Sequence, residues 1–488
     1  MILVRISKED LKVILRDLGS ILFVVGYILL LPLAVACIYK EKSLYFAFIY
    51  PSMAAIWTGF FLKKLFRGAE ETKLKHAMID AGLAWLVVSL IGAFPYWHYG
   101  FSPLDSYFES MSGFTTTGMT TIQNVEVLPK SLLFWRALAQ WIGGVGVIML
   151  FLVVLLQSQL VVRRFYSAEA RSERVTPAVS TTITYIWRIY FLFTAFGVTL
   201  YYLAGMNLFD AVAHTFTSLA TGGFSTQNLS IRGYDSLAIE AVAVLLMLVG
   251  GISFVVHYRV LTEGRRELLK NLESRAFLAI IFIASLLVSL HLMYEGFSPL
   301  NAFRYGVFQA VAVMTTTGYT TADMFPWSDF IKIVLLFLMF TGGCSGSTAG
   351  GFKVLRVVIF LKDAYHEIIR TILPEKAVVH LKVGNRIMER EIILRLSGMF
   401  FLFIAFGVGG GIVFTLLGYD ALAAMSLSFS ALGNVGPVFL SPQDWFALSS
   451  LAKSILIFEM WIGRLEIFPA LALISALLIA IRREQIST

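Results

Sequence analysis

The sequence predicts an all-α polytopic membrane protein, in which two N-terminal transmembrane helices precede four similar units of helix, short helix and helix. Composition is the first observation behind this prediction: 58% of the 488 residues are hydrophobic and 14% are charged. Soluble domains contain about 45–50% apolar and about 25% charged residues. The second observation is a recurring polar motif, because SGFTTTGMTT at 112–121 returns as VMTTTGYTTA at 313–322.

Ten apolar runs are long enough to cross a bilayer, whose core of about 30 Å needs roughly 20 apolar residues in a helix. They lie near 18–39, 43–62, 78–97, 131–158, 181–204, 235–258, 276–294, 329–361, 391–418 and 445–481. Several exceed the length of one span, which permits a tilt or a break.

Four shorter apolar stretches lie between these runs and are too short to cross, which is typical of re-entrant or pore helices. They lie near 104–114, 208–220, 299–314 and 420–432. An acid or amide opens each one, and we expect these side chains to cap the helix N-termini. The residues are Asp105, Asp210, Asn301 and Asp420.

Basic residues cluster in loops that ten spans would place on one side of the membrane. The clusters fall within 5–16, 63–75, 163–174, 259–275, 353–395 and 482–483. The positive-inside rule makes this side cytoplasmic, with both termini there. The net charge of +8 is therefore explained by topology and not by a nucleic-acid partner. No small-residue cleavage site follows the first apolar run, so we expect a cytosolic lead-in and not a cleaved signal.

The four short helices run into polar loops that align with one another. DSYFESMSGFTTTGMT (105–120) aligns without a gap with DAVAHTFTSLATGGFS (210–225), and FQAVAVMTTTGYT (308–320) and SLSFSALGNVGPV (426–438) follow. The alignment superimposes Gly118, Gly223, Gly318 and Gly436. A second marker follows each loop: Gly143-Gly144, Gly250-Gly251, Gly342-Gly343 and Gly463-Arg464. These markers predict repeats over 71–165, 166–268, 269–375 and 376–488, after an N-terminal two-helix domain over 1–70.

Non-helical backbone at membrane depth is tolerated only where protein buries it or water reaches it. Four such loops on a pseudo-fourfold axis can form a central ion pore, where peptide carbonyls replace the hydration shell of a cation. Glycine permits the φ > 0 conformations that such loops need. The helix C-termini add negative dipole ends, and the absence of an acidic ring favours a monovalent cation over Ca²⁺ or Mg²⁺. The threonines and Ser225 either add oxygen ligands or brace the loops.

The chain resembles the Trk/Ktr/HKT superfamily of potassium uptake proteins, specifically the bacterial TrkH/TrkG type. The resemblance covers essentially the whole chain, and ten spans favour the TrkH type over the eight-span KtrB type. The stretches that carry it are FESMSGFTTTG (108–118), LATGGFST (219–226), TTTGYTT (315–321), GGCSGSTAGGFKVLR (342–356) and MWIGRLEIFP (460–469).

The resemblance implies a K⁺-selective filter, with Rb⁺ also accepted, because glycine in all four loops accompanies K⁺ selectivity in the family. Plant relatives with serine in the first loop conduct Na⁺. The fourth loop here, LGNVGPV, departs from the more usual asparagine-rich pattern. The implied K⁺-binding residues are Thr116, Thr117, Gly118, Thr221, Gly222, Gly223, Thr316, Thr317, Gly318, Asn434, Val435 and Gly436.

The stretch GGCSGSTAGG at 342–351 interrupts an apolar run with five glycines in ten residues. Each glycine costs a helix roughly 1 kcal/mol relative to alanine, which predicts a broken helix; glycine-mediated helix packing is the alternative. The resemblance implies an intramembrane gating loop. The predicted gate residues are Gly342, Gly343, Cys344, Ser345, Gly346, Ser347, Thr348, Ala349, Gly350, Gly351, Lys353 and Arg464.

Arg464 lies inside the last apolar run, where an unpaired charge is costly and is a functional candidate by default. We expect it to narrow the pathway beneath the filter and to hold the 342–351 loop through backbone carbonyls. The alternative is a structural bridge to Glu466. Lys353 is a weaker candidate at the exit, and Cys344 is expected to be a packing residue. His214 and Glu109 are expected to be packing or hydrogen-bonding groups.

The sequence contains no GxGxxG after a strand and no Walker-type motif, so no nucleotide domain is expected. The resemblance implies that nucleotide acts only through a separate cytosolic TrkA-type regulatory subunit, which would dock on the basic segment 362–395. It also implies a homodimer, the commonest closed assembly. No covalent cofactor is expected, and seven scattered histidines and two lone cysteines argue against an enzyme.

The sequence thus predicts potassium uptake across the bacterial cytoplasmic (inner) membrane through a gated, channel-like pore. The membrane potential would drive it, at about 2.3 kcal/mol per charge per 100 mV. K⁺ symport with H⁺ or Na⁺ is the alternative. Alternating access usually accompanies inverted repeats and midplane sites, whereas these repeats are parallel and their polar loops share one side.

Overall fold

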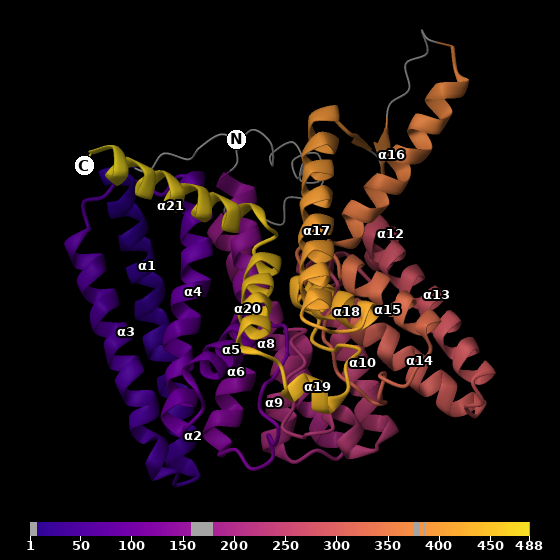
Figure 1. The fold of residues 1–488 in the computed structure, drawn as a ribbon, viewed down its shortest axis with the longest axis horizontal. Coiled ribbons are helices and arrows are strands. Elements are labelled where there is room, and N and C mark those ends of the chain that lie inside the picture. Colours follow the sequence, from indigo (N-terminus) through magenta and orange to yellow (C-terminus); the bar gives the residue numbers. More distant parts are fainter. Residues whose placement is uncertain (1–6, 158–178, 375–380, 385, 488) are drawn as a thin grey trace.

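The computed structural model describes residues 7–157, 179–374, 381–384 and 386–487 (Figure 1). The predicted basic cluster at 163–174 and the boundary between the first two repeats at 165 and 166 lie outside these residues. The described chain is almost wholly helical, which confirms the predicted fold class. Apart from the helices it contains one two-stranded antiparallel hairpin, β1 (Lys382–Val383) with β2 (Arg386–Ile387).

The N-terminal domain is a helical hairpin whose two arms pack closely. α1 (Lys8–Ile28) and α2 (Leu30–Ile38) together form one span of 31 residues, and α3 (Tyr45–Leu65) returns after the short 3-10 helix η1 (Lys42–Leu44). Small residues permit the close approach: the Ser52 hydroxyl donates to the Gly26 carbonyl at 2.7 Å. A Cβ on Gly26 would lie 2.9 Å from the backbone nitrogen of Ile56.

Each of the four following units contains a long first helix of 23–27 residues, a short second helix of 12–16 residues and a third helix of 13–28 residues. The first is α4 (Leu74–Tyr99), α5 (Pro103–Phe114) and α6 (Lys130–Gln157); the second is α8 (Val179–Leu203), α9 (Leu208–Leu219) and α10 (Leu237–Gly251). The third is α13 (Leu272–Tyr294), α14 (Pro299–Met314) and α15 (Asp329–Thr341), and the fourth is α17 (Arg390–Leu416), α18 (Ala421–Gly433) and α20 (Ser450–Arg464). In every unit the first long helix packs on its own short helix.

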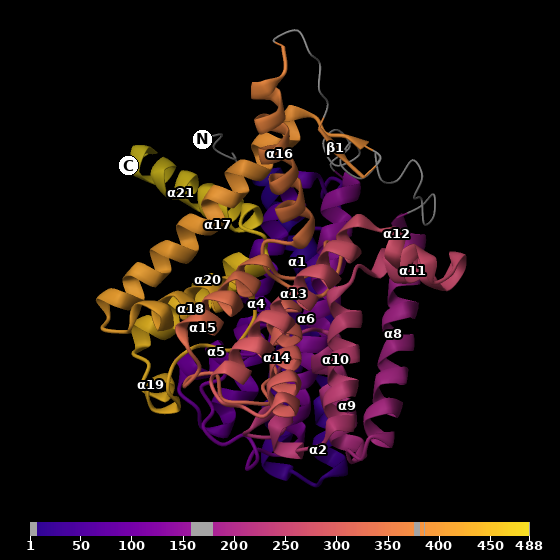
Figure 2. The same cartoon turned by 90° about the vertical axis from the view of Figure 1, so that its right-hand side faces the viewer.

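Shorter helices connect or follow these units. They are η2 (Ser230–Tyr234), α11 (Phe254–Glu263), α12 (Arg266–Lys270), α16 (Val354–Ile372), α19 (Pro442–Phe446) and α21 (Phe468–Ser487). α16 projects from the upper face in Figures 1 and 2, and α21 runs along that face in Figure 1. The loops after α3 and around α12, which hold two of the predicted basic clusters, lie at this face, as do the ends of α1 and α21 next to the termini.

Not every predicted run is one continuous helix. Six described helices are individually long and apolar enough to cross a membrane, and two bent pairs raise the number to eight. The run 235–258 bends by 100° between α10 and α11, and 445–481 bends by 114° between α20 and α21. The run 131–158 coincides with α6, and 329–361 is divided between α15 and α16. Arg464 is therefore the last residue of α20, before a bend at which Glu466 and Ile467 have positive φ.

The predicted capping of the short helices is wrong in three of four cases. Asp420 does cap α18, accepting a hydrogen bond from the backbone of Leu422. In the other three, the residue three positions earlier is the cap, and it accepts from the backbone N–H of the predicted residue. The caps are Ser102, Asn207 and Ser298. Proline at the first helical position favours these starts, because its missing N–H needs no partner there, as at Pro103 and Pro299.

Candidate ion filter and intramembrane loop

The four short helices end in the same unusual backbone conformation. The second residue after three of them is a threonine with positive φ: Thr116 (53°), Thr221 (51°) and Thr316 (56°). Asn434 takes this place in the fourth unit, with φ 54°. A left-handed backbone costs a residue with a Cβ about 1–2 kcal/mol and is unfavourable above all for β-branched side chains. Such strain is common at functional sites. Only the asparagine, which tolerates this conformation, could have indicated it in the sequence.

The aligned glycines lie two residues further on and also have positive φ. The values are 82° at Gly118, 77° at Gly223, 74° at Gly318 and 107° at Gly436. Each glycine faces a carbonyl oxygen of the neighbouring loop, and the order of contacts closes on itself. Gly118 faces Gly222, Gly223 faces Thr317, Gly318 faces Val435, and Gly436 faces Thr117. Even at the least crowded position, Gly436, an added Cβ would lie 2.6 Å from that oxygen. The four loops therefore form a closed ring that admits no side chain.

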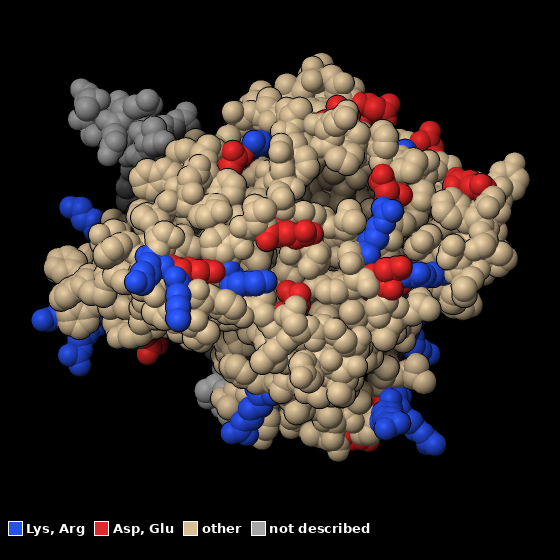
Figure 3. All heavy atoms as spheres, turned by 90° about the horizontal axis from the view of Figure 1, so that it is seen from below, with Lys and Arg blue, Asp and Glu red and all other residues tan. Residues whose placement is uncertain are grey.

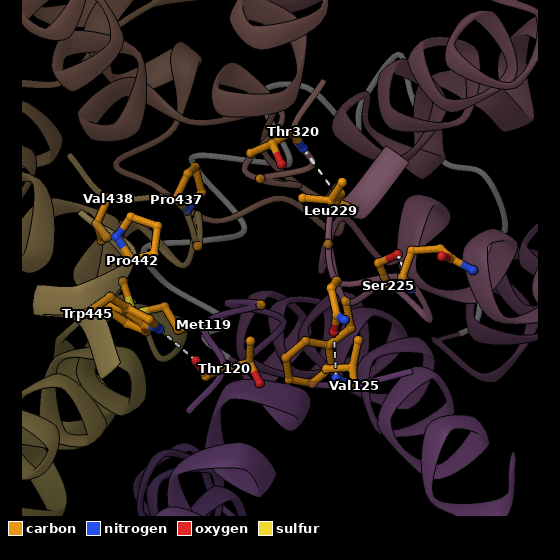
Figure 4. Close-up of a pocket in the computed structure, with 18 of the residues that line it drawn as sticks. Met119, Thr120, Val125, Ser225, Leu229, Thr320, Pro437, Val438, Pro442 and Trp445 are labelled. Atoms are coloured by element: carbon orange, nitrogen blue, oxygen red, sulfur yellow. Dashed lines mark hydrogen bonds between the residues drawn. The ribbon is translucent and has the colours of Figure 1, made fainter. Parts of the chain in front are cut away.

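A cavity of about 420 Å³ opens from this ring towards the face opposite the termini, which is the lower face in Figure 1 and is hollowed near its middle (Figure 3). All four glycines line it, together with residues of the loops that follow (Figure 4). Hydrogen bonds join those loops: Trp445 Nε1 donates to the Thr120 carbonyl at 2.8 Å, and the Arg232 backbone donates to the Thr320 carbonyl at 3.1 Å. The cavity thus connects the ring with the surface of the molecule opposite the termini.

Most of the hydroxyls around the ring brace the loops. Thr115 and Thr117 Oγ1 atoms lie 2.8 Å apart, and Thr315 and Thr317 repeat this contact at the same distance. Ser225 Oγ lies 3.0 Å from His214 Nε2 and accepts from the backbone of Gln227. The buried hydroxyl of Thr116 has no partner within the described part of the chain. The geometry therefore favours bracing over coordination for Ser225 and for the last threonine of each triplet.

A buried ion pair supports the first two loops, and the sequence did not single it out as such. Glu109 and Arg136 are 0% and 2% exposed, and Arg136 Nη2 lies 3.5 Å from Glu109 Oε2. Glu109 accepts from the Thr120 hydroxyl at 2.7 Å, while Arg136 donates to the Ser225 carbonyl at 3.2 Å. The guanidinium also stacks 4.1 Å from the Phe224 ring centroid. The pair bridges two loops and adds no net charge beside the ring.

The interrupted segment, 342–353, contacts the ring on the side that faces the termini. Every residue from 342 to 353 is buried. The Cys344 backbone donates to the Gly251 carbonyl at 2.9 Å, and Cys344 is a free thiol. The Gly350 backbone donates to Thr316 Oγ1 at 2.7 Å, and Thr348 Oγ1 lies 3.2 Å from Thr221 Oγ1. The segment is therefore in contact with two loops of the ring, those that contain Thr221 and Thr316.

Two buried cations donate to backbone carbonyls of this segment: Arg464 of the fourth unit and Lys353, which belongs to the segment itself. Arg464 is 3% exposed; its Nη1 donates to the Thr348 carbonyl and its Nη2 to the Gly143 carbonyl, both at 2.9 Å. Glu466 does not pair with Arg464 but accepts from Arg356. Lys353, which has φ 85°, donates to the carbonyl of Ala349. Arg464 thus joins the segment to the first unit across the pore.

Glu273 is a contact of this segment that the sequence reasoning missed. It lies in the first turn of α13 and is 7% exposed. Its Oε1 accepts from the Ser345 backbone at 2.6 Å and from the Leu355 backbone at 3.1 Å. One carboxylate oxygen therefore joins the first part of the segment to the first turn of α16, which follows it. A glutamate in the first turn of a helix reads as an ordinary favourable dipole contact, so the sequence offered no specific signal.

The second marker allows the long helices to approach the ends of the short ones. The first glycine of three markers faces a carbonyl oxygen at the end of a short helix. Gly143 faces Phe114, the last residue of α5, and Gly250 faces Leu219, the last residue of α9. Gly463 faces Leu432, the next-to-last residue of α18. At Gly250 an added Cβ would lie 2.7 Å from that oxygen. α6 continues through its marker, whereas α10, α15 and α20 end at theirs.

A ring of four pore loops within a multi-pass bundle defines a membrane protein that moves ions. The family model for TrkH, a cation transport protein, matches residues 46–479. The chain belongs to this family, whose members are transporters and not enzymes.

Relatives cover nearly the whole chain. An uncharacterized cation transporter of Methanocaldococcus jannaschii is 37% identical over 478 residues, 97% of each chain. The Trk system potassium uptake protein TrkH of Halomonas elongata is 33% identical, covering 95% of this chain and 98% of its own. The crystal structure of the potassium transporter TrkH from Vibrio parahaemolyticus superimposes with a TM-score of 0.85 at 30% identity, covering 95% of this chain and 98% of that one.

Proposed function

We propose that this protein takes up potassium across the bacterial cytoplasmic membrane through a gated, K⁺-selective pore. The closed ring of loops around Gly118, Gly223, Gly318 and Gly436 is the observation that carries the proposal. Relatives named as potassium uptake proteins, at 32–33% identity, support K⁺ as the ion. The face with the termini and the basic loops is the cytoplasmic one, so the ion enters from the cavity on the opposite side of the ring.

K⁺ binds in the ring through neutral oxygens of the residues named above as the filter. No acidic side chain lies in the four loops between residues 115–118, 220–223, 315–318 and 434–436. A monovalent cation with a weakly held hydration shell suits such a site better than a divalent one, which prefers carboxylates or retained water. Rb⁺ resembles K⁺ in this respect and is also accepted.

The segment 342–353 is the gate, with Arg464 as its latch. A hydrogen bond from a charged group contributes about 1.5–3 kcal/mol, and Arg464 makes two, to Thr348 and to Gly143. Loss of both would free the segment from the first unit. The segment contacts Thr316 and Thr221 in this structure. Opening therefore requires that the segment move away from these two residues.

The membrane potential drives uptake in this proposal. K⁺ symport with H⁺ or Na⁺ remains the second candidate function. The four units repeat in the same orientation, and their loops meet at one level, whereas alternating access usually uses inverted repeats around a midplane site. That arrangement favours a pore.

A cytosolic TrkA-type nucleotide-binding subunit and a second copy of this chain are the proposed partners. α16 projects from the cytoplasmic face and exposes an apolar stripe made of Leu361, Tyr365, Ile368 and Ile372. The stripe and the basic residues of 362–395 provide a surface on which such a subunit can dock. Nucleotide acts there, through the subunit.

Reconstitution in liposomes tests the proposal. Inward flux of K⁺ and Rb⁺ should follow an imposed voltage and exceed that of Na⁺ and Li⁺, and Arg464→Ala should raise K⁺ flux by about tenfold, the effect of roughly 1.4 kcal/mol. Arg304→Ala, which removes the partner of Glu240, is the matched control away from the segment 342–353. Flux that ignores the voltage, or that follows only a proton or sodium gradient, would sink the channel proposal in favour of symport.

A further inference from the structure

A second cavity, with a volume of about 450 Å³, lies among α1, α4 and α6. Its walls are apolar almost throughout and include Ile21, Val25, Ala84, Val88 and Ile142. Thr72, in the loop before α4, lines one part, and Phe114, the last residue of the pore helix α5, lines another. Cavities of about 300–1,000 Å³ hold small molecules in other proteins.

Asp80 is the one acidic or basic side chain that lines this cavity within the described residues. It is 6% exposed, and neither of its oxygens has a hydrogen-bond partner in the described chain. Arg16 and Asp17 on α1, two charged side chains that interact electrostatically with Asp80, are already engaged. Arg16 donates to the carbonyls of Ala69 and Glu70, to the Thr72 hydroxyl and to Asp17, and Thr72 donates to Asp17. A buried carboxyl without a partner opposes folding, so the packing of the described residues gives no reason for Asp80.

We propose that this cavity binds a hydrophobic amine, with its ammonium group on Asp80 and its apolar body against the walls. An ammonium group supplies the hydrogen-bond donors and the positive charge that both carboxylate oxygens lack. If the carboxyl enters the complex protonated, the neutral amine takes that proton, and the product is the same ammonium–carboxylate pair. A metal ion would find no second ligand here, and an acyl chain alone would leave the carboxyl unpaired.

An occupant of the cavity would touch the residues that hold the latch. Gly143 lines the cavity, and its carbonyl accepts the hydrogen bond from Arg464 Nη2. Phe114 also lines it, and its carbonyl accepts from Trp85 Nε1 at 3.3 Å. Binding therefore changes the flux of the pore through Gly143. This second step rests on the proposed role of Arg464, whereas binding itself does not.

Thermal denaturation of the purified full-length protein tests the binding. n-Octylamine should raise the Tm of the wild type more than 1-octanol does, because the two differ only in the polar head. Asp80→Asn should abolish the difference. Glu459→Gln is the matched control, because Glu459 is also a buried carboxylate, 3% exposed, but lies outside the cavity; it should keep the difference. Equal shifts from amine and alcohol, or a shift that survives in Asp80→Asn and in Asp80→Ala, would overturn the proposal.

Rb⁺ flux into liposomes, with and without n-octylamine at constant pH, tests the second step. The amine should change wild-type flux at least twofold relative to the same protein without amine, and it should leave the flux of Asp80→Asn at that variant's own amine-free value. A Tm shift without any change in flux would contradict the coupling through Gly143 and leave the site in place. A flux change common to wild type and Asp80→Asn would show an effect on the lipid and would contradict the coupling as well.

Discussion

The four ring loops and the segment 342–353 are both glycine-rich interruptions of helical structure, and they are built in opposite ways. The ring is made of four equivalent loops, each of which contacts the next, so that it is complete within itself. The segment 342–353 occurs once, in the third unit, and its partners come from three units: Gly251 of the second, Glu273 at the start of the third and Arg464 of the fourth. A self-complete ring suits a fixed site, whereas a piece held by separate anchors can be released.

The largest expected effect comes from breaking the ring at its most crowded position. In Gly223→Ala the new Cβ would meet the Thr317 carbonyl, and the left-handed backbone would add about 1–2 kcal/mol of strain. Since the ring cannot absorb a side chain, we expect uptake of Rb⁺ to fall by at least about tenfold and discrimination against Na⁺ to weaken. Isotope uptake in liposomes with K⁺, Rb⁺ and Na⁺ measures both.

Gly418→Ala is the matched control, because Gly418 has φ 97° and open space around an added Cβ. It imposes a similar backbone strain outside the ring and should leave selectivity unchanged. Equal losses in the two variants would mean that backbone strain alone, and not contact between the loops, explains the effect. Gly118→Ser extends the test to the first loop, where discrimination against Na⁺ should also weaken.

An intermediate effect is expected from loosening one anchor of the segment 342–353. Glu273→Ala leaves the buried backbone N–H of Ser345 and the half-buried backbone N–H of Leu355 without their acceptor. An unsatisfied buried donor costs about 1–3 kcal/mol. We expect K⁺ flux without any regulatory subunit to rise about fivefold or more, since 1–2 kcal/mol is a factor of about 5–30. Selectivity should stay as in the wild type, because the ring is untouched.

Glu273→Gln separates shape from charge, because its amide oxygen can still accept both hydrogen bonds, so its flux should rise less than that of Glu273→Ala. Glu459→Ala is the control for a lost buried carboxylate, because Glu459 accepts a hydrogen bond from Ser428, outside the segment. A rise in flux in Glu459→Ala as large as in Glu273→Ala would refute the idea of a specific anchor.

The sequence predicted the repeated parts of the molecule well and the unique contacts poorly. The short helices, the four glycines and the interruption at 342–351 follow from patterns of length and residue type, and the structure has them at the expected places. The sequence predicted a packing or hydrogen-bonding role for Glu109, and in the structure it accepts hydrogen bonds from Thr120 and Thr121. Arg136 and Glu273 did not stand out because their partners lie far away in the chain or on the backbone. The bends after α10 and α20 were also missed, because hydropathy measures how apolar a run is and not whether it is straight.

The smallest expected effect concerns the one quarter of the ring that differs. Asn434 tolerates the left-handed backbone better than Thr116, Thr221 or Thr316, and its Nδ2 donates to Thr117 Oγ1 and to the Met460 carbonyl, both at 3.0 Å. Asn434→Thr makes this position like the other three, so K⁺ selectivity should survive. The apparent Tm should fall by roughly 1–3 °C because strain is added and two hydrogen bonds are lost.

Asn434→Gly distinguishes these two causes, because glycine adopts positive φ without strain but also loses both hydrogen bonds. If strain matters, Asn434→Gly should have a higher Tm than Asn434→Thr, although glycine has the more flexible unfolded chain. A threonine variant as stable as the wild type would mean that the ring holds its first residues left-handed at no cost. The positive φ values of the three threonines would then reflect tight packing of the loops, and the asparagine in the fourth unit would owe its place to its bonds with Thr117 and Met460 alone.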